Sequence, residues 1–287
     1  MGFFYFICYN LKMRKIKTVF LGTPDISVYF LERLKELGFV FDLIITNPDV
    51  KVGRKQVLTP SAVAVWAEKN KIDVLKPEKI NQDLKEKLKK ENYDLFFVLA
   101  YGKILPKDFL EIPPLGVLNL HPSLLPKYRG PSPIISAILD DQKFTGLSIM
   151  QLSEKMDAGD ILIQENVLVD EWIKNDKLEK HFAEIGAERF FENLENIVDQ
   201  KIKPQKQNEK EVTYCQKYQK KDMELSFPLT DYKNYLKYCA FSKPFFFDKK
   251  KKRVIVTKAK LENNQFVIEK IVKEGKKESD FNPKDFE

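Results

Sequence analysis

Short apolar runs alternate with amphipathic helical patterns from Lys17 onward, and this alternation constrains the fold more than any other feature of the chain. Parallel strands need long crossover connections, usually helices, so the pattern predicts an α/β unit with an open, mostly parallel, Rossmann-like sheet. The expected strands are 18–21, 41–45, 73–75, 94–100 and 116–120, and the expected helices are 26–37, 61–70, 81–91, 132–139 and 176–199. Two longer runs, 145–152 and 161–169, predict an antiparallel pair.

The 287 residues exceed a typical single domain, so a second, smaller unit is expected. Residues 205–211 are polar and lack apolar periodicity, as linkers do. Beyond them, the short runs 253–259 and 264–272 indicate a small β-rich unit. The predicted division is a catalytic domain over 13–204, a linker over 205–211 and a β domain over 212–287.

The first twelve residues are apolar but shorter than the roughly 20 residues that cross a bilayer. Met13 directly precedes a basic lead-in and the first strand, so we interpret residues 1–12 as an untranslated prefix. Three widely spaced cysteines, Cys8, Cys215 and Cys239, form no C-x-x-C pair and support neither a disulfide framework nor a zinc site. The expectation is a reducing, cytoplasmic compartment and no metal.

The positive charge is unevenly distributed. Residues 1–204 hold 29 Lys and Arg and 29 Asp and Glu, whereas 205–287 hold 20 against 13, so the net charge of +7 lies in the last part. A basic unit on a neutral domain favours a polyanionic partner such as nucleic acid, and a solvated lysine-rich surface is the alternative.

Asn119 and His121 lie at the carboxyl end of the strand predicted over 116–120. Residues two apart on a strand point to the same face, and open α/β sheets bind ligands at the carboxyl ends of their strands. The two side chains can therefore act on one atom. The other histidine, His181, falls on a charged amphipathic helix and is expected to be an ordinary surface residue.

The segment Asn119-Leu120-His121-Pro122-Ser123-Leu124-Leu125-Pro126, followed by Arg129-Gly130, resembles the signature of formyltransferases that use 10-formyltetrahydrofolate. Met156-Asp157-Ala158-Gly159-Asp160 is similar to the second catalytic segment of that family. The resemblance covers nearly all of residues 16–165. It implies that Asn119, His121 and Asp157 are catalytic. It also implies a folate site formed by Ser123, Leu124, Leu125, Pro126, Ala100, Tyr101 and Gly102.

These residue types suit formyl transfer to an amine. Negative charge develops on the formyl oxygen as the amine attacks, and donors on Asn119 and His121 can stabilise that charge. Asp157 can orient the imidazole and help to remove the proton from the amine. The alternative for Asp157 is a carboxylate that only caps the turn before Gly159.

The acceptor is predicted from other segments. The loop 47–60 resembles the basic loop with which family members that formylate methionyl-tRNA contact the acceptor stem, and it supplies Lys51, Arg54 and Lys55. Fewer Gly and Lys follow Arg54 than is usual in the family, and an ordinary surface turn is the alternative.

A second basic group, Lys250, Lys251 and Arg253, stands beside three phenylalanines in the part where the family has an OB-like β-barrel that binds tRNA. Here that part is shortened after Ala259, and an exposed turn beside core phenylalanines is the alternative. The resemblance implies initiator methionyl-tRNA as acceptor, 10-formyltetrahydrofolate as donor and a monomeric enzyme. There are two competing hypotheses. The acceptor is an amino-sugar nucleotide, or the chain is an inactive RNA-binding protein on the same scaffold.

Overall fold

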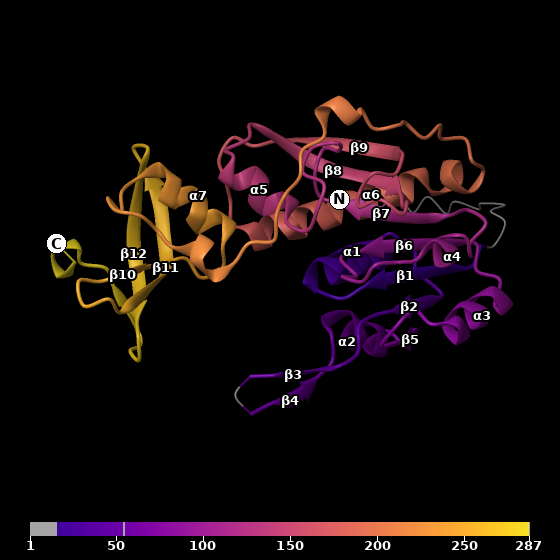
Figure 1. The fold of residues 1–287 in the computed structure, drawn as a ribbon, viewed down its shortest axis with the longest axis horizontal. Coiled ribbons are helices and arrows are strands. Elements are labelled where there is room, and N and C mark those ends of the chain that lie inside the picture. Colours follow the sequence, from indigo (N-terminus) through magenta and orange to yellow (C-terminus); the bar gives the residue numbers. More distant parts are fainter. Residues whose placement is uncertain (1–15, 54, 287) are drawn as a thin grey trace, which may run out of the picture.

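The computed structural model describes residues 16–53 and 55–286, so the prefix, Met13 and Arg54 lie outside the described residues. Within the described part, a seven-stranded sheet carries the amino-terminal two thirds of the chain and a four-stranded sheet carries the carboxyl end (Figure 1). The described helices include none that is long and apolar enough to cross a membrane.

The central sheet has the order β5-β2-β1-β6-β7-β8-β9. Its first five strands are parallel and β8 and β9 are antiparallel, which confirms the predicted Rossmann-like sheet and its antiparallel pair. The strands are β1 (Thr18–Gly22), β2 (Leu43–Ile45), β5 (Asp73–Leu75), β6 (Leu95–Leu99), β7 (Val117–His121), β8 (Phe144–Gln151) and β9 (Ile161–Leu168).

Apolar residues on both faces of these strands bury the sheet between helices. Phe20 and Phe97 belong to one core cluster, and their neighbours Val19 and Phe96 belong to the other, because successive strand residues point to opposite faces. The first cluster includes residues of α1 (Asp25–Glu36), α2 (Ala62–Lys69), α5 (Pro133–Leu139) and α6 (Asn175–Val198). The second includes residues of α3 (Gln82–Lys90) and α4 (Lys107–Leu110).

Helix α6 approaches the sheet closely behind β7. A Cβ atom added at Gly186 would lie 2.5 Å from Leu120 Cδ2, well inside van der Waals contact. Leu120 is the residue between Asn119 and His121, so this glycine lets the helix press directly on the strand that carries both side chains.

The carboxyl-terminal unit is an antiparallel sheet with one helix packed on it. Its strands follow the order β10-β11-β12-β13, and α7 (Tyr232–Ala240) contacts β11, β12 and α5. The strands are β10 (Phe245–Phe247), β11 (Arg253–Glu262), β12 (Gln265–Lys273) and β13 (Glu278–Asp280). A small β unit is therefore confirmed, but in the described residues the sheet is open, and the predicted OB-like barrel is not confirmed.

The loop between β2 and α2 forms a hairpin that sequence analysis did not anticipate. Strands β3 (Val50–Val52) and β4 (Val57–Thr59) pair antiparallel and project away from the central sheet (Figure 1). Val50, Val52 and Val57 are exposed although they are β-branched and apolar. The hairpin is therefore held by backbone pairing and not by a core of its own.

The predicted linker runs back along the catalytic unit. Gln205 pairs with Ile161 through the backbone, the backbone N–H of Cys215 donates to the Arg129 carbonyl at 2.8 Å, and Tyr214 forms an isolated bridge with Arg129. Among the described residues, short 3₁₀ turns also occur at Glu209–Glu211, Lys220–Met223 and Pro283–Asp285. The segment is thus docked against the first unit and does not hang free between two units.

Candidate active site

The carboxyl end of β7 opens into a cleft of about 700 Å³. Asn119 and His121 line this cleft from the strand, and Asp157 lines it from the loop between β8 and β9. The structure therefore brings together the three residues that the sequence predicts to be catalytic, and it places them at the ligand-binding edge of an open α/β sheet.

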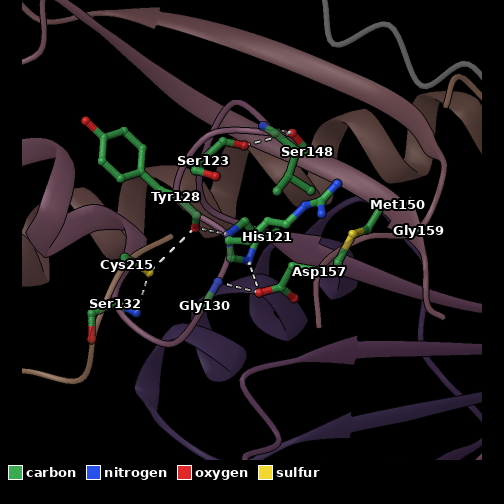
Figure 2. A network of polar contacts seen from close by, with 12 residues as sticks. His121, Ser123, Tyr128, Gly130, Ser132, Ser148, Met150, Asp157, Gly159 and Cys215 are labelled. Carbon is green, nitrogen blue, oxygen red and sulfur yellow. Dashed lines mark hydrogen bonds and ion pairs between the residues drawn. The ribbon is translucent and has the colours of Figure 1, made fainter. Parts of the chain in front are cut away.

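The imidazole of His121 is almost fully buried, and both ring nitrogens face polar groups. Nε2 lies 2.9 Å from the carbonyl oxygen of Tyr128, and Nδ1 lies 3.7 Å from Oδ2 of Asp157 (Figure 2). A carbonyl oxygen can only accept, so this contact assigns a proton to Nε2. Nδ1 is then the nitrogen that can exchange a proton, and 3.7 Å is too long for a direct hydrogen bond to Asp157.

The carboxylate of Asp157 is held from the opposite side. The backbone N–H of Gly130 donates to the same Oδ2 at 2.7 Å, so the loop after β7 contributes to the position of the carboxylate (Figure 2). Asp157 has a φ of 49°, in the left-handed region that non-glycine residues seldom adopt. Gly159 has no room for a side chain, because a Cβ atom there would lie 1.6 Å from the Gln151 carbonyl oxygen.

The loop after β6 forms another wall of the cleft. Ala100, Tyr101 and Gly102 all line it, as the sequence predicts for folate-contacting residues. Asn47 Nδ2 donates to the Tyr101 carbonyl at 2.8 Å and fixes the loop. Burial raises the pKa of Tyr101 to about 12, and its hydroxyl has no hydrogen-bond partner within the described chain.

The remaining predicted folate residues, Ser123 to Pro126, do not line the cleft. They brace the loop that follows β7. Ser123 Oγ donates to the Lys127 carbonyl at 2.7 Å. Ser148 Oγ donates to the Ser123 carbonyl at 2.7 Å (Figure 2). Gln164 Nε2 donates to the Leu125 carbonyl at 2.9 Å. This bracing presents the Tyr128 carbonyl to His121, and folate contact by these four residues stays a prediction.

The predicted tRNA-binding residues lie away from the cleft. Lys51 is on β3, Lys55 is in the hairpin turn, and Lys250 and Lys251 are in the turn before β11, all of them exposed. Arg253 begins β11, and its guanidinium carbon lies 5.7 Å from the centre of the Phe245 ring. Arg54 is outside the described residues.

Four further polar residues at or beside the site were missed by sequence analysis. Asn175 and Glu179, at the start of α6, line the cleft, and burial raises the pKa of Glu179. Arg129 and Gln207 pack beneath the Asp157 loop, and the Arg129 side chain is only 2% exposed. A helix start and a polar linker carry no sequence signal for a catalytic cleft, although Arg129 lies within the recognised motif.

The described residues contain no group of His, Cys, Asp and Glu side chains that could hold a metal ion.

Comparison with known proteins identifies the catalytic unit. The family model described as formyl transferase matches residues 16–194. A methionyl-tRNA formyltransferase of Caldicellulosiruptor saccharolyticus is 41% identical over 215 residues, which cover 74% of this chain and 68% of the relative. One from Bacillus cereus is 45% identical over 201 residues, which cover 70% of this chain and 64% of the relative. The matched segments thus span about two thirds of these relatives.

The fold extends beyond the segments matched in sequence. The solved structure of a methionyl-tRNA formyltransferase from Clostridium thermocellum superposes with a TM-score of 0.62 at 17% identity, over 90% of this chain and 99% of that chain. The cleft, the motif residues that line it and the match over residues 16–194 agree, and the chain belongs to the formyl transferase family.

Proposed function

We propose that this protein transfers the formyl group of 10-formyltetrahydrofolate to the amino group of methionine on initiator tRNA. The observation that carries the proposal is the meeting of Asn119, His121 and Asp157 in one cleft, on a chain whose relatives at 41% and 45% identity are methionyl-tRNA formyltransferases. The proposed division into a catalytic domain over 13–204 and a tRNA-binding unit over 212–287 follows from the same resemblance.

The cleft suits a folate donor. Its walls are mainly apolar, with Val98, Leu105, Leu110 and Leu152 beside the loop that carries Tyr101, and a few polar groups converge on it. A flat heteroaromatic ring needs such a surface for burial, and the polar groups fix its orientation. Ala100, Tyr101 and Gly102 would hold the donor so that its formyl carbon reaches Asn119 and His121.

The proton positions define the part played by His121. Nε2–H is committed to the Tyr128 carbonyl, so only Nδ1 can donate toward the cleft, and it can do so when the ring is an imidazolium. The Asp157 carboxylate, 3.7 Å away, can orient the ring. The Asn119 amide and Nδ1–H then stabilise the negative charge that develops on the formyl oxygen.

The reaction needs one bond formed, one bond broken and one proton moved. The neutral amine nitrogen bonds to the formyl carbon, the bond from that carbon to the folate nitrogen breaks, and a proton passes from the amine to the departing nitrogen. Asp157, held by the Gly130 N–H, can accept this proton directly or through water and pass it on.

For the acceptor, we propose that the basic turn at Lys250, Lys251 and Arg253 and the hairpin with Lys51 and Lys55 contact phosphates of the tRNA. The excess of positive charge in residues 205–287 supports this, because phosphate contacts dominate affinity for nucleic acids. We further propose a monomeric, cytoplasmic enzyme. Cys215 and Cys239 are both free and buried, as in proteins of reducing compartments.

The decisive experiment is a formylation assay with purified initiator methionyl-tRNA and labelled 10-formyltetrahydrofolate, comparing the wild type with His121→Ala. We expect formylmethionyl-tRNA from the wild type and a rate at least about 100-fold lower from the variant, because an oxyanion donor is lost. Formylation of an amino-sugar nucleotide in its place would support the alternative acceptor. Absence of transfer to either acceptor, with tRNA still bound, would favour an inactive RNA-binding protein.

A further inference from the structure

Gln207 stands in the segment predicted to be a linker, yet its side chain lies beneath the catalytic loop. Its amide nitrogen donates to the Asp157 carbonyl at 2.8 Å and to the Gly159 carbonyl at 2.7 Å. Its amide oxygen accepts from Nε of Arg129 at 3.0 Å. Both ends of one side chain thus bond to the two loops that carry Asp157 and Gly130.

The loop that Gln207 contacts needs an external partner. Asp157 is a non-glycine residue at a φ of 49°, a backbone conformation that costs about 1 kcal/mol or more and persists only where surrounding contacts enforce it. The carbonyls of Asp157 and Gly159 both accept from the amide nitrogen of Gln207. Gln207 therefore stabilises the conformation that points the Asp157 carboxylate at His121.

Arg129 connects this contact to the other half of the site. It precedes Gly130, whose N–H donates to the Asp157 carboxylate, and its own carbonyl accepts from the Cys215 N–H at 2.8 Å. Its buried guanidinium also pairs with Glu209 at 2.9 Å. Arg129 and Gln207 thereby tie the loop after β7, the Asp157 loop and residues 205–215 into one hydrogen-bonded unit.

We infer that Gln207 is a positioning residue for Asp157, so that the segment joining the two units forms part of the active site. This inference rests on the proposed formyl transfer for its kinetic consequence, but the geometry it describes is independent of the acceptor. Because Gln207 holds the Asp157 loop, an intact active site requires this segment to be docked. The same segment leads into the carboxyl-terminal unit.

Three variants separate the donor and acceptor roles of the amide. Gln207→Leu removes both roles. Gln207→Glu keeps the shape and the contact with Arg129 but replaces the NH₂ donor by a carboxylate oxygen, which repels the two carbonyls. Gln205→Leu is the matched control, because Gln205 is exposed and pairs with Ile161 through its backbone.

We expect Gln207→Leu and Gln207→Glu to lower kcat by about tenfold or more, with KM for both substrates within about twofold of the wild type. Gln205→Leu should retain wild-type kinetics. If Gln207→Glu keeps full kcat, the contacts with the two carbonyls do not position Asp157 and the inference is wrong. A rise in KM alone would overturn it too, because it would assign Gln207 to binding.

A second readout does not depend on activity. The chain has only two histidines, so their ring resonances can be followed separately by NMR. Loss of the Gln207 donors should move the His121 resonances, because Asp157 shifts away from Nδ1, and leave those of the exposed His181 unchanged. Unmoved His121 resonances would refute the positioning role, whereas an inactive wild type with moved resonances would refute only the proposed function.

Discussion

At the scale of single residues, the charge on Asp157 is expected to matter more than its shape. Asp157→Asn can still accept from the Gly130 N–H but, as a neutral amide, can no longer accept the proton of the attacking amine. We predict a fall in kcat of about 100-fold or more, measured by single-turnover formylation. Asp160→Asn, at the residue directly after Gly159, is the control and should retain turnover within about twofold.

Full activity of Asp157→Asn would instead assign the carboxylate to capping the turn, the alternative left open by the sequence. In that case the Gly130 contact would be its whole function.

Glu179 gives a prediction about stability and pH. Burial raises the pKa of Glu179, so the folded protein holds that proton more tightly than the unfolded chain does. The ionised carboxylate therefore lowers stability once the pH rises above its unfolded pKa, and the full cost is present above the folded pKa. Glu179→Gln removes this cost and leaves an amide oxygen that can accept from Asn175 Nδ2.

We expect the Tm of Glu179→Gln to exceed that of the wild type at pH 8 and the difference to shrink toward pH 4. Differential scanning calorimetry across this range measures the effect. A Tm difference that stays constant with pH would show that ionisation of Glu179 costs the fold nothing.

At the scale of elements, Lys174, the residue directly before α6, contacts the carboxyl-terminal unit. Lys174 Nζ donates to the carbonyls of Tyr238 and Phe241 at the end of α7, and it lies 3.9 Å from the centre of the Tyr238 ring. Burial lowers the pKa of Lys174, so these contacts hold a desolvated ammonium. We predict that Lys174→Met lowers the free energy of unfolding by about 1–3 kcal/mol, because two carbonyls lose their donor.

Urea denaturation followed by circular dichroism measures this loss, and Lys177→Met, at an exposed position in the first turn of α6, is the control. Equal stability of the two variants would mean that Lys174 does not hold α7 in place.

The elements also show what could be predicted from the sequence. The buried strands and amphipathic helices of the central sheet have strong periodicity, and the strand end at Asn119 and His121 lies where alternation places it. The β3–β4 hairpin and α7 were missed. The hairpin has no buried face to produce a pattern, and α7 mixes tyrosines and lysines because it packs against two different units.

Contacts between distant segments account for the remaining omissions. Nothing local in residues 205–211 distinguishes Gln207 from a solvated linker residue, because its partners belong to the β8–β9 loop and to Arg129. Likewise, the motif does not show that the hydrogen bonds of Ser123 brace the chain around His121, while folate contact by Ser123 to Pro126 stays a prediction.

At the scale of the whole molecule, the positive charge should govern tRNA binding. Replacing Lys250, Lys251 and Arg253 by Ala should weaken binding of methionyl-tRNA and reduce the slope of log K against log salt by about 2–3, since each lost phosphate contact removes about 0.9. The turnover number at saturating tRNA should not change, because these residues lie outside the cleft.

Filter binding at several salt concentrations measures the slope. Lys87→Ala with Lys90→Ala, on α3 at the opposite end of the molecule, is the control for removal of surface charge (Figure 1). An unchanged slope in the triple variant would identify the turn as an ordinary solvated surface.

The close approach of α6 to β7 has a genetic consequence. Any side chain at Gly186 would push on Leu120 and tilt the neighbouring amide and imidazole, although Gly186 itself does not line the cleft. A random screen for loss of formylation should therefore recover substitutions at Gly186 alongside those at His121. Second-site substitutions that restore activity to Gly186→Ala should replace Leu120 by a smaller residue.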